Sequence, residues 1–410
     1  MGIKGGTQIK QDIRGGHEGV LFREPALHGG VQSLFYTRSR ARIIDCMLEL
    51  YYRPPHCVTG AQLCDWFFRT RILPATQTGQ ILVLVFDNQK RTPRCKAACQ
   101  AKRRTRARTL DSDLEIGDDA VLPDDWYGLM ATSKLRLRMF AYLLGCMQKK
   151  LERLMPHEIL QGGAVYCSPP YLEDYLRDET GGEYRDLDQY KRGEALEMTR
   201  TDLLPALPET CQGEGDLLCK VWVQHLAKFL PEDSEILVKT KDWDTVCAFL
   251  TTPPVNRVCI HVGDIKPKKS TERKQLEYVD IYKFYYEMLK GDQQLALNYV
   301  MGNILSGSDY CEGVYGVSGR ALLRTLLKMP REKRAVLYDG ASLRLSRPNL
   351  KDWIRNSKRG SKPLKRQPRM LKRASWNLVY WLALEKRPNP INFGGWAKET
   401  NGILMPIEDS

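Results

Sequence analysis

One almost purely apolar run constrains the fold of this chain more than any other feature. Residues 81–87 read ILVLVFD. Because the run has no polar face, it cannot be an amphipathic helix, and it predicts a central strand buried on both sides. Similar runs at 42–45, 164–167, 235–242 and 257–262 continue the series, and we expect the last to close the sheet. Helical patterns, notably at 133–155, lie between them. This alternation predicts an α/β fold with a central, mostly parallel sheet covered by helices on both faces.

The pattern changes after residue 263. Residues 279–305 predict two helices broken near Gly291, and residues 321–328 predict another. Residues 351–373 contain ten Lys and Arg but one acid, which favours either a disordered basic tail or a phosphate-contacting strap. We therefore expect three regions: a core over 1–263 with a basic insert at about 90–132 and an acidic insert at about 169–208, a helical module over 264–335, and a basic extension over 336–410.

The composition indicates a soluble protein with a polyanionic partner. The formal net charge is +14 and the isoelectric point is near 9.2; charge alone does not identify the partner. The twelve cysteines include no CxxC pair, which is typical of reduced thiols in an intracellular protein. No apolar stretch approaches the roughly 18 residues of a membrane span, so we expect no membrane partner.

Seven acidic residues are candidate metal ligands, because two-metal hydrolysis of phosphodiesters needs several carboxylates in one pocket. They are Asp45, Asp87, Glu214, Asp216, Asp242, Asp244 and Asp309. Taken singly, an acid at a strand end is more often a helix cap or a loop residue. Their local contexts decide the interpretation.

The segment GSDYC at 307–311, followed by GVSGRA at 316–321, closely resembles the flap endonuclease and XPG-type nuclease family. Further segments resemble that family in the same order: MGIKG at 1–5, IIDCMLELYY at 43–52, FFRT at 67–70, VFDNQK at 85–90, AKRR at 101–104, GEGD at 213–216 and KTKDWD at 239–244. The resemblance implies a PIN-like nuclease domain over the core, with a C-terminal helix-two-turn-helix module. It suggests a divergent member, of the kind that a large DNA virus encodes.

The resemblance also implies roles for individual residues. Asp45, Asp87, Glu214 and Asp216 are similar to the ligands of the tighter metal site, and Asp242, Asp244 and Asp309 to those of the second. Asp216 departs from the usual Glu, which shortens one ligand. Arg94, Lys102 and Arg103 are similar to the catalytic cations that steady the scissile phosphate. Their run is alternatively a solvated basic helix or a nuclear-import signal.

The nucleic-acid-binding residues that the resemblance implies are Gly2, Tyr51, Arg69, Gly316, Val317, Gly319 and Arg320. Tyr51 would stack on a base, or it is a core aromatic. Gly316 to Arg320 would form the helix-two-turn-helix hairpin, which binds duplex phosphates and could hold a monovalent cation. The ending NGILMPIEDS lacks the family's sliding-clamp-binding box.

The sequence thus predicts a nuclease that uses two Mg²⁺, with Mn²⁺ as a substitute, near single-strand to double-strand junctions of DNA. It would act as a monomer inside the cell, in the nucleus, or in the host nucleus if viral. One alternative is an RNA-degrading nuclease of the same fold, suggested by GEGD, which is similar to an element of Xrn-type exoribonucleases, and by the acidic insert. The other is a non-catalytic DNA-binding scaffold.

Overall fold

The computed structural model describes most of the predicted core and parts of the region after it. The described residues are 6–14, 19–26, 38–88, 110, 113–154, 162–170, 194–208, 214–266, 273–307 and 322–328, and the short pieces 338–339, 344–345, 397–400 and 403–406. The short pieces form two small antiparallel pairs, β9 (Tyr338–Asp339) with β10 (Arg344–Leu345) and β11 (Ala397–Thr400) with β12 (Ile403–Pro406).

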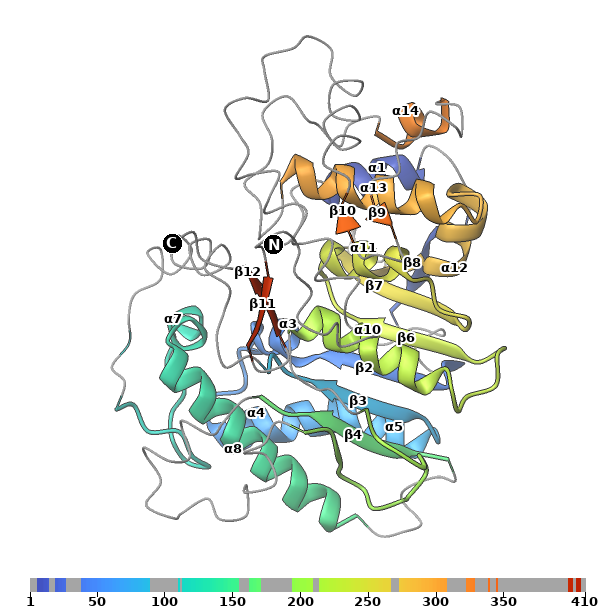
Figure 1. Cartoon of the computed structure of the whole chain (residues 1–410). Coiled ribbons are helices and arrows are strands. Elements are labelled where there is room, and N and C mark those ends of the chain that lie inside the picture. The colour runs from blue at the N-terminus through green and yellow to red at the C-terminus, as the bar shows by residue number, and fades with distance from the viewer. Residues whose placement is uncertain are drawn as a thin grey trace.

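An eight-stranded sheet in the order β1-β8-β7-β6-β2-β3-β4-β5 forms the centre of the described chain (Figure 1). Its strands are β1 (Leu21–Pro25), β2 (Ala41–Asp45), β3 (Ile81–Val85), β4 (Ala164–Ser168), β5 (Leu196–Glu197), β6 (Glu235–Lys239), β7 (Arg257–Ile265) and β8 (Gln275–Asp280). The neighbouring strands from β4 through β3, β2 and β6 to β7 are parallel. The predicted α/β fold with a mostly parallel sheet is confirmed.

The apolar run at 81–87 forms the interior strand that its composition predicts. All five residues of β3 are buried, and the strand pairs with β2 on one side and β4 on the other. Successive residues face opposite layers, because side chains alternate along a strand. Val83 and Val85 belong to one hydrophobic core, whereas Leu82 and Leu84 belong to the other. A strand that is buried on both faces can therefore be apolar throughout.

Helices cover both faces of the sheet. The first core packs beneath α10 (Gly215–Leu226), α11 (Trp243–Thr251) and α13 (Gln293–Ser306). The second packs beneath α4 (Gly60–Phe67), α7 (Trp126–Ala131) and α8 (Ser133–Glu152). In Figure 1 the strands run from β8 at the top to β4 at the bottom, with α10 at the level of β6 and β2 and α4 at the level of β3 and β4. The remaining helical elements are α1 (Gly6–Arg14), α3 (Cys46–Leu50), η2 (Phe68–Ile72), α5 (Leu73–Gln77), α12 (Ile281–Lys283), η5 (Phe284–Met288) and α14 (Leu322–Lys328).

The prediction that residues 257–262 close the sheet is wrong. Strand β7 continues to Ile265 and pairs with β8, which in turn pairs with β1, both antiparallel. Five of the six residues of β8 are buried, including Glu277, whose carboxylate pairs with Lys10, Arg14 and Arg23 from α1 and β1. These contacts between distant segments hold two strands that local sequence does not mark. The sheet thus extends past residue 263, and the division into three regions stays a prediction.

The helices that follow β8 agree with the sequence pattern. Helical structure from Ile281 ends at Met288 and resumes at Gln293, so the predicted break near Gly291 is confirmed. Gly291 itself has a φ of 62°, which L-residues rarely adopt. The predicted helix at 321–328 is α14, which packs on α13. The predicted hairpin at 316–320 lies outside the described residues. No helix in the described ranges is long and apolar enough to cross a membrane.

Candidate active site

The strand order brings several predicted carboxylates to one edge of the sheet. The chain runs from β2 to β3 and β4 on one side, then enters β6 and β7 on the other side of β2. In open parallel sheets, ligands bind at the carboxyl ends of the strands where the order reverses in this way. That point lies between β2 and β6. Asp45 is the last residue of β2, and Asp87 and Asp242 follow β3 and β6 closely.

Asp45 is held rigidly at the start of α3. Its Oδ1 accepts hydrogen bonds from the backbone N–H groups of Met47 at 3.0 Å and Leu48 at 3.3 Å. The residue has an extended backbone and caps the helix, so one side chain both ends β2 and begins α3. Only 5% of Asp45 is exposed. The sequence alternative of a helix cap is therefore correct for Asp45, and it is compatible with a metal-ligand role for the same carboxylate.

Asp87 and Asp45 meet at the first residue of α10. The backbone N–H of Gly215 donates to Asp87 Oδ1 at 2.7 Å. A Cβ atom built on Gly215 would lie 3.2 Å from Asp87 Oδ1 and 3.3 Å from Asp45 Oδ1. Glycine at this position thus lets the helix approach both carboxylates. Glu214, the N-cap residue of α10, directly precedes Gly215 in the chain and is buried.

Asp242 and Asp244 occupy the start of α11. Asp242 caps this helix, and its Oδ1 accepts a hydrogen bond from the Asp244 N–H at 3.1 Å. Asp244 is buried, while Asp242 is partly exposed. Two helices, α10 and α11, therefore begin at this edge of the sheet with acids in their first turns, and their N-terminal dipoles favour those charges.

The carboxylates interact electrostatically. Burial, together with the charge of Asp87 and to a smaller extent that of Asp242, raises the pKa of Asp45 to about 8 against the lowering effect of the two backbone hydrogen bonds. Burial, followed by the charges of Asp45, Asp216 and Asp87, also raises the pKa of Cys219. Asp216 therefore belongs to the same acidic cluster. Its carboxylate accepts a hydrogen bond from the N–H of Leu217 at 2.8 Å.

The chemistry of these donors fits hard divalent cations. Mg²⁺ prefers carboxylate oxygens, and like charges this close ionise together only when a cation offsets their repulsion. The raised pKa of Asp45 reflects its burial first and then this repulsion. Among the residues that the structure describes, no three His, Cys, Asp or Glu side chains already converge on one metal position.

Several predicted site residues lie outside the described residues. They are Gly2, Arg94, Lys102, Arg103, Asp309, Gly316, Val317, Gly319 and Arg320. Their roles stay predictions.

Tyr51 and Arg69 are described, and both are exposed. Tyr51 follows α3 and is 41% exposed, so it is not a core aromatic. Its ring centroid lies 6.4 Å from that of Tyr127, which is also exposed and which the sequence did not single out. The Arg69 side chain is mostly exposed and pairs with Asp65 at 2.8 Å. Both are therefore accessible to a ligand, and their binding roles stay predictions.

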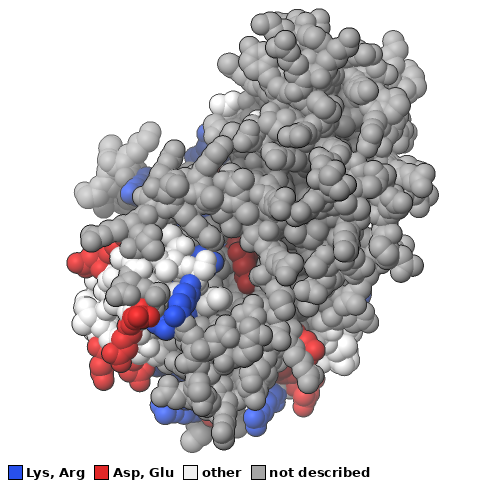
Figure 2. Space-filling model, turned by 60° about the vertical axis from the view of Figure 1, so that its left-hand side comes forward, with Lys and Arg blue, Asp and Glu red and all other residues white. Residues whose placement is uncertain are grey.

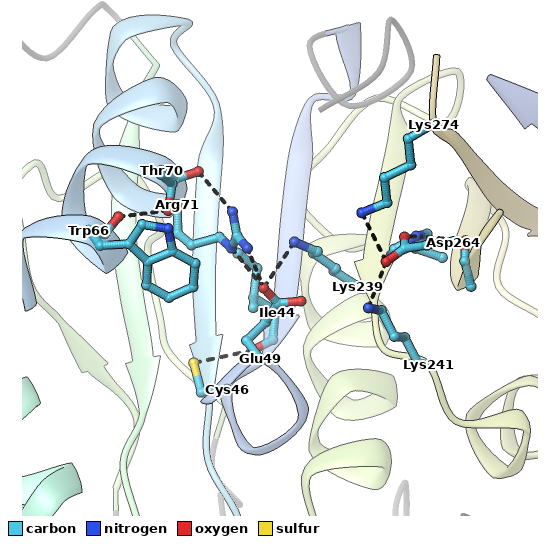
Figure 3. A network of polar contacts seen from close by, with 12 residues as sticks. Ile44, Cys46, Glu49, Trp66, Thr70, Arg71, Lys239, Lys241, Asp264 and Lys274 are labelled. Atoms are coloured by element: carbon cyan, nitrogen blue, oxygen red, sulfur yellow. Dashed lines mark hydrogen bonds and ion pairs between the residues drawn. The ribbon is translucent and has the colours of Figure 1, made fainter. Parts of the chain in front are cut away.

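A buried ion-pair triad beside the acidic cluster was missed in the sequence. Glu49 Oε2 accepts from Arg71 at 2.7 Å and from Lys239 Nζ at 3.0 Å, and all three side chains are almost fully buried (Figure 3). Glu49 lies on α3, Arg71 on η2 and Lys239 at the end of β6. The triad thus connects the elements that carry Asp45 and Asp242. The signal for it was Lys239 at the end of an apolar strand, since a buried cation needs an anionic partner.

A second network lies beside Asp242. Lys241 and Lys274 both pair with Asp264, at 2.9 and 3.1 Å, and the same carboxylate contacts buried His261 at 3.0 Å (Figure 3). Basic and acidic side chains are also interspersed on the described part of the face in Figure 2. Lys239, Lys241 and Lys274 are therefore engaged by acids.

No protein-family model matches this chain, and no curated protein matches it. Among solved structures it is similar to the catalytic core of Rad2 in complex with DNA substrate, seen in two complexes. For one, the TM-score is 0.36 and the identity 14%, over 82% of this chain and 69% of that chain. For the other, the values are 0.37 and 10%, over 96% and 98%. The likeness is distant, and the chain's own sheet defines its fold.

Proposed function

We propose that this chain is a metal-dependent nuclease that hydrolyses phosphodiester bonds. The observation that carries the proposal is the gathering of Asp45, Asp87 and Asp242 at the point where the strand order reverses, with the pKa of Asp45 raised to about 8 by burial and by the other two charges. A buried carboxylate that is repelled by neighbouring acids destabilises a protein unless a ligand offsets its charge, so Asp45 and its neighbours indicate a functional site.

Among the described acids, Asp45 and Asp87 follow β2 and β3 and Glu214 and Asp216 lie at the start of α10, whereas Asp242 and Asp244 follow β6 and lie at the start of α11. Asp45, Asp87, Glu214 and Asp216 would hold one Mg²⁺, and Asp242, Asp244 and Asp309 would hold the other. When bound, such a pair of ions activates the attacking water and stabilises the charge that develops on the phosphate.

The described residues orient these carboxylates. One oxygen of Asp45, of Asp87 and of Asp242 accepts a backbone N–H at 2.7 to 3.1 Å. Each carboxylate therefore has a fixed direction before any ion binds. Such preorganisation lowers the cost of assembling the site.

We further propose DNA near single-strand to double-strand junctions as the substrate, on the strength of the ordered sequence resemblance. Tyr51 is exposed and lies one short helix away from Asp45, which supports the proposal that it stacks on a base. The GEGD segment favours RNA as a second candidate, because it is similar to an element of exoribonucleases of the same fold. A non-catalytic DNA scaffold would have no use for acids that repel the buried Asp45 carboxylate.

One assay separates these candidates. Purified full-length protein is offered labelled five-prime flap DNA, nicked duplex, single-stranded DNA and single-stranded RNA, each with Mg²⁺ or with EDTA. The proposal expects cutting of the flap substrate near its junction with Mg²⁺ and none with EDTA. Equal or faster cutting of RNA would favour the second candidate, and no cutting of any substrate at any Mg²⁺ or Mn²⁺ concentration would contradict a nuclease.

A further inference from the structure

Two exposed tyrosine rings from distant parts of the sequence meet beside the candidate active site. Tyr51 is the C-cap of α3, and Tyr127 lies in the first turn of α7. Their ring centroids are 6.4 Å apart, and the ring planes are tilted by 39°. Tyr127 is 47% exposed, slightly more than Tyr51. Each ring therefore has surface that a ligand can contact.

The backbone segments that carry the two rings are tied together. The buried Trp126 indole donates to the Leu50 carbonyl at 2.7 Å, which joins the residues just before the two tyrosines. The Arg53 guanidinium carbon lies 5.7 Å from the centre of the Trp126 ring, and its Nη1 donates to the Leu122 carbonyl at 3.1 Å. The Leu122 N–H in turn donates to the Val58 carbonyl at 2.8 Å. The fold therefore sets the distance between the two backbone positions.

The tyrosine pair lies close to the acidic cluster. Asp45 caps one end of α3 and Tyr51 caps the other. The helix has five residues, which at a rise of about 1.5 Å per residue makes it roughly 8 Å long. A strand of nucleic acid with a phosphate at Asp45 therefore has its neighbouring bases within reach of the rings.

The charges beside the rings decide which part of a strand can face them. Asp119 and Asp124 are exposed on the segment that leads into α7, and Asp125 caps that helix. The cation Arg53 is largely buried and pairs with Asp124 at 3.9 Å. Because carboxylates repel phosphates, this surface favours contact with bases over contact with the phosphate backbone. Stacking on an aromatic ring is such a contact, since every base has a π-face.

From this geometry we propose that Tyr127 is a second stacking residue, which together with Tyr51 holds two successive bases of one unpaired strand. The ring separation carries the inference, because 6.4 Å is almost twice the roughly 3.4 Å spacing of bases along one strand of a duplex. Bases that stack on both rings are therefore spread apart and tilted, as a flexible single strand allows and a duplex does not. The inference rests on the proposed function for its class of ligand, and it adds a residue that selects single strands.

The test is fluorescence anisotropy of labelled oligonucleotides with full-length protein in EDTA, where the metal-dependent cutting that we propose cannot occur. We expect Tyr127→Ala to bind oligo(dT) at least roughly 5-fold more weakly than the wild type, the lower end of what the loss of one stacked base costs. Tyr127→Phe keeps the ring and should bind as the wild type does. Binding of blunt duplex DNA should be the same for all three proteins. The same series with oligo(U) distinguishes the two kinds of strand, since the rings hold the one whose binding falls more in Tyr127→Ala.

Tyr282→Ala is the matched control. Tyr282 is 45% exposed, and its ring also meets that of another exposed tyrosine, Tyr286, at 4.5 Å. It follows β8, which runs antiparallel to β7 and so ends at the opposite edge of the sheet from the carboxylates. Tyr282→Ala should therefore bind oligo(dT) as the wild type does.

The salt dependence of binding gives a second readout that a change in local structure alone does not produce. Stacking releases no counterions, so the slope of log affinity against log salt should be the same in Tyr127→Ala and in the wild type. A slope smaller by about 0.7, the contribution of one phosphate contact to a single strand, would overturn the inference. Oligo(dT) affinity of Tyr127→Ala within about 2-fold of that of Tyr282→Ala would overturn it as well. Weaker binding by Tyr127→Ala in a protein that cuts no substrate would support the stacking site and contradict the nuclease.

Discussion

Replacing Glu49 with Gln should strongly destabilise the protein, because it leaves Arg71 and Lys239 buried without their anion. The three side chains are 6% to 9% exposed, so solvent screens them little. Removing one partner from a buried ion pair costs about 3 to 5 kcal/mol. The pKa of Glu49 gives a second measure of the stability that the triad contributes. Burial alone would raise the pKa of Glu49, but Lys239 and Arg71 lower it from 4.5 to about 2. A shift of that size corresponds to about 3 kcal/mol.

The pH dependence of stability follows from the direction of the shift. Because the folded-state pKa is lower than the unfolded value, the contribution of Glu49 is fully present above about pH 4.5 and is lost as the pH falls toward 2. The free energy of unfolding, measured by urea denaturation, should therefore differ between wild type and Glu49→Gln by about 3 kcal/mol at pH 7. The difference should shrink between pH 5 and pH 2.

Two further variants sharpen the test. Glu232→Gln, at an exposed loop position, should leave the free energy of unfolding unchanged. Glu49→Gln combined with Lys239→Met should recover part of the loss, since it removes a buried charge. A loss below about 1 kcal/mol for Glu49→Gln, or a difference that does not vary between pH 7 and pH 3, would refute the reasoning.

Three other predictions concern the acidic cluster and its surroundings. The folded-state pKa of Asp45 is raised from 3.8 to about 8, so its contribution to stability is fully present below about pH 4 and is lost as the pH rises through 8. In EDTA at pH 9, Asp45→Asn should therefore melt at a higher temperature than the wild type. The same variant should lose the stabilisation that Mg²⁺ gives the wild type. An equal or lower melting temperature for this variant would contradict the claim that the ionised Asp45 carboxylate destabilises the folded protein. Gly215→Ala should lower the rate of Mg²⁺-dependent cutting roughly 10-fold or more with little change in melting temperature, because its Cβ would crowd Asp87 and Asp45. Unchanged cutting would show that this close approach is not needed. Tyr51→Ala should weaken binding of single-stranded DNA by about 1 to 3 kcal/mol in fluorescence anisotropy, whereas Tyr51→Phe should bind as wild type does. Equal weakening by both changes would rule out stacking.

The parts of the fold that the sequence predicts well are those where local pattern and burial agree. Residues 81–85 are apolar without interruption because β3 is covered on both faces, and the acids at 45, 87 and 242 mark strand ends. Strands β8 and β1 were missed, because QLEYVD and LFREP alternate or mix charges. Their strand structure depends on pairing between segments more than 250 residues apart, as in Leu21 with Val279. Local propensity does not contain that information.

The candidate site shows the same division. The order of acids along the chain predicted carboxylates at strand ends, and Asp45, Asp87 and Asp242 lie there. Their role as metal ligands stays a prediction. The Glu49 triad was not predicted, because the sequence does not say that positions 49, 71 and 239 meet. Tyr127 was missed for the same reason: its ring meets that of Tyr51 from a distant segment, next to the hydrogen bond that the Trp126 indole donates to the Leu50 carbonyl at 2.7 Å.

The most direct test of the nuclease proposal is a comparison of cutting and binding in Asp242→Asn. This change removes one charge from the acidic cluster and keeps the size of the side chain, and Asp233→Asn at an exposed loop serves as the matched control. With five-prime flap DNA and Mg²⁺, we expect Asp242→Asn to bind the DNA as the wild type does and to cut it at least roughly 100-fold more slowly. Asp233→Asn should cut at the wild-type rate. An unchanged cutting rate for Asp242→Asn, in protein free of contaminating nuclease, would contradict the assignment of this cluster as the active site.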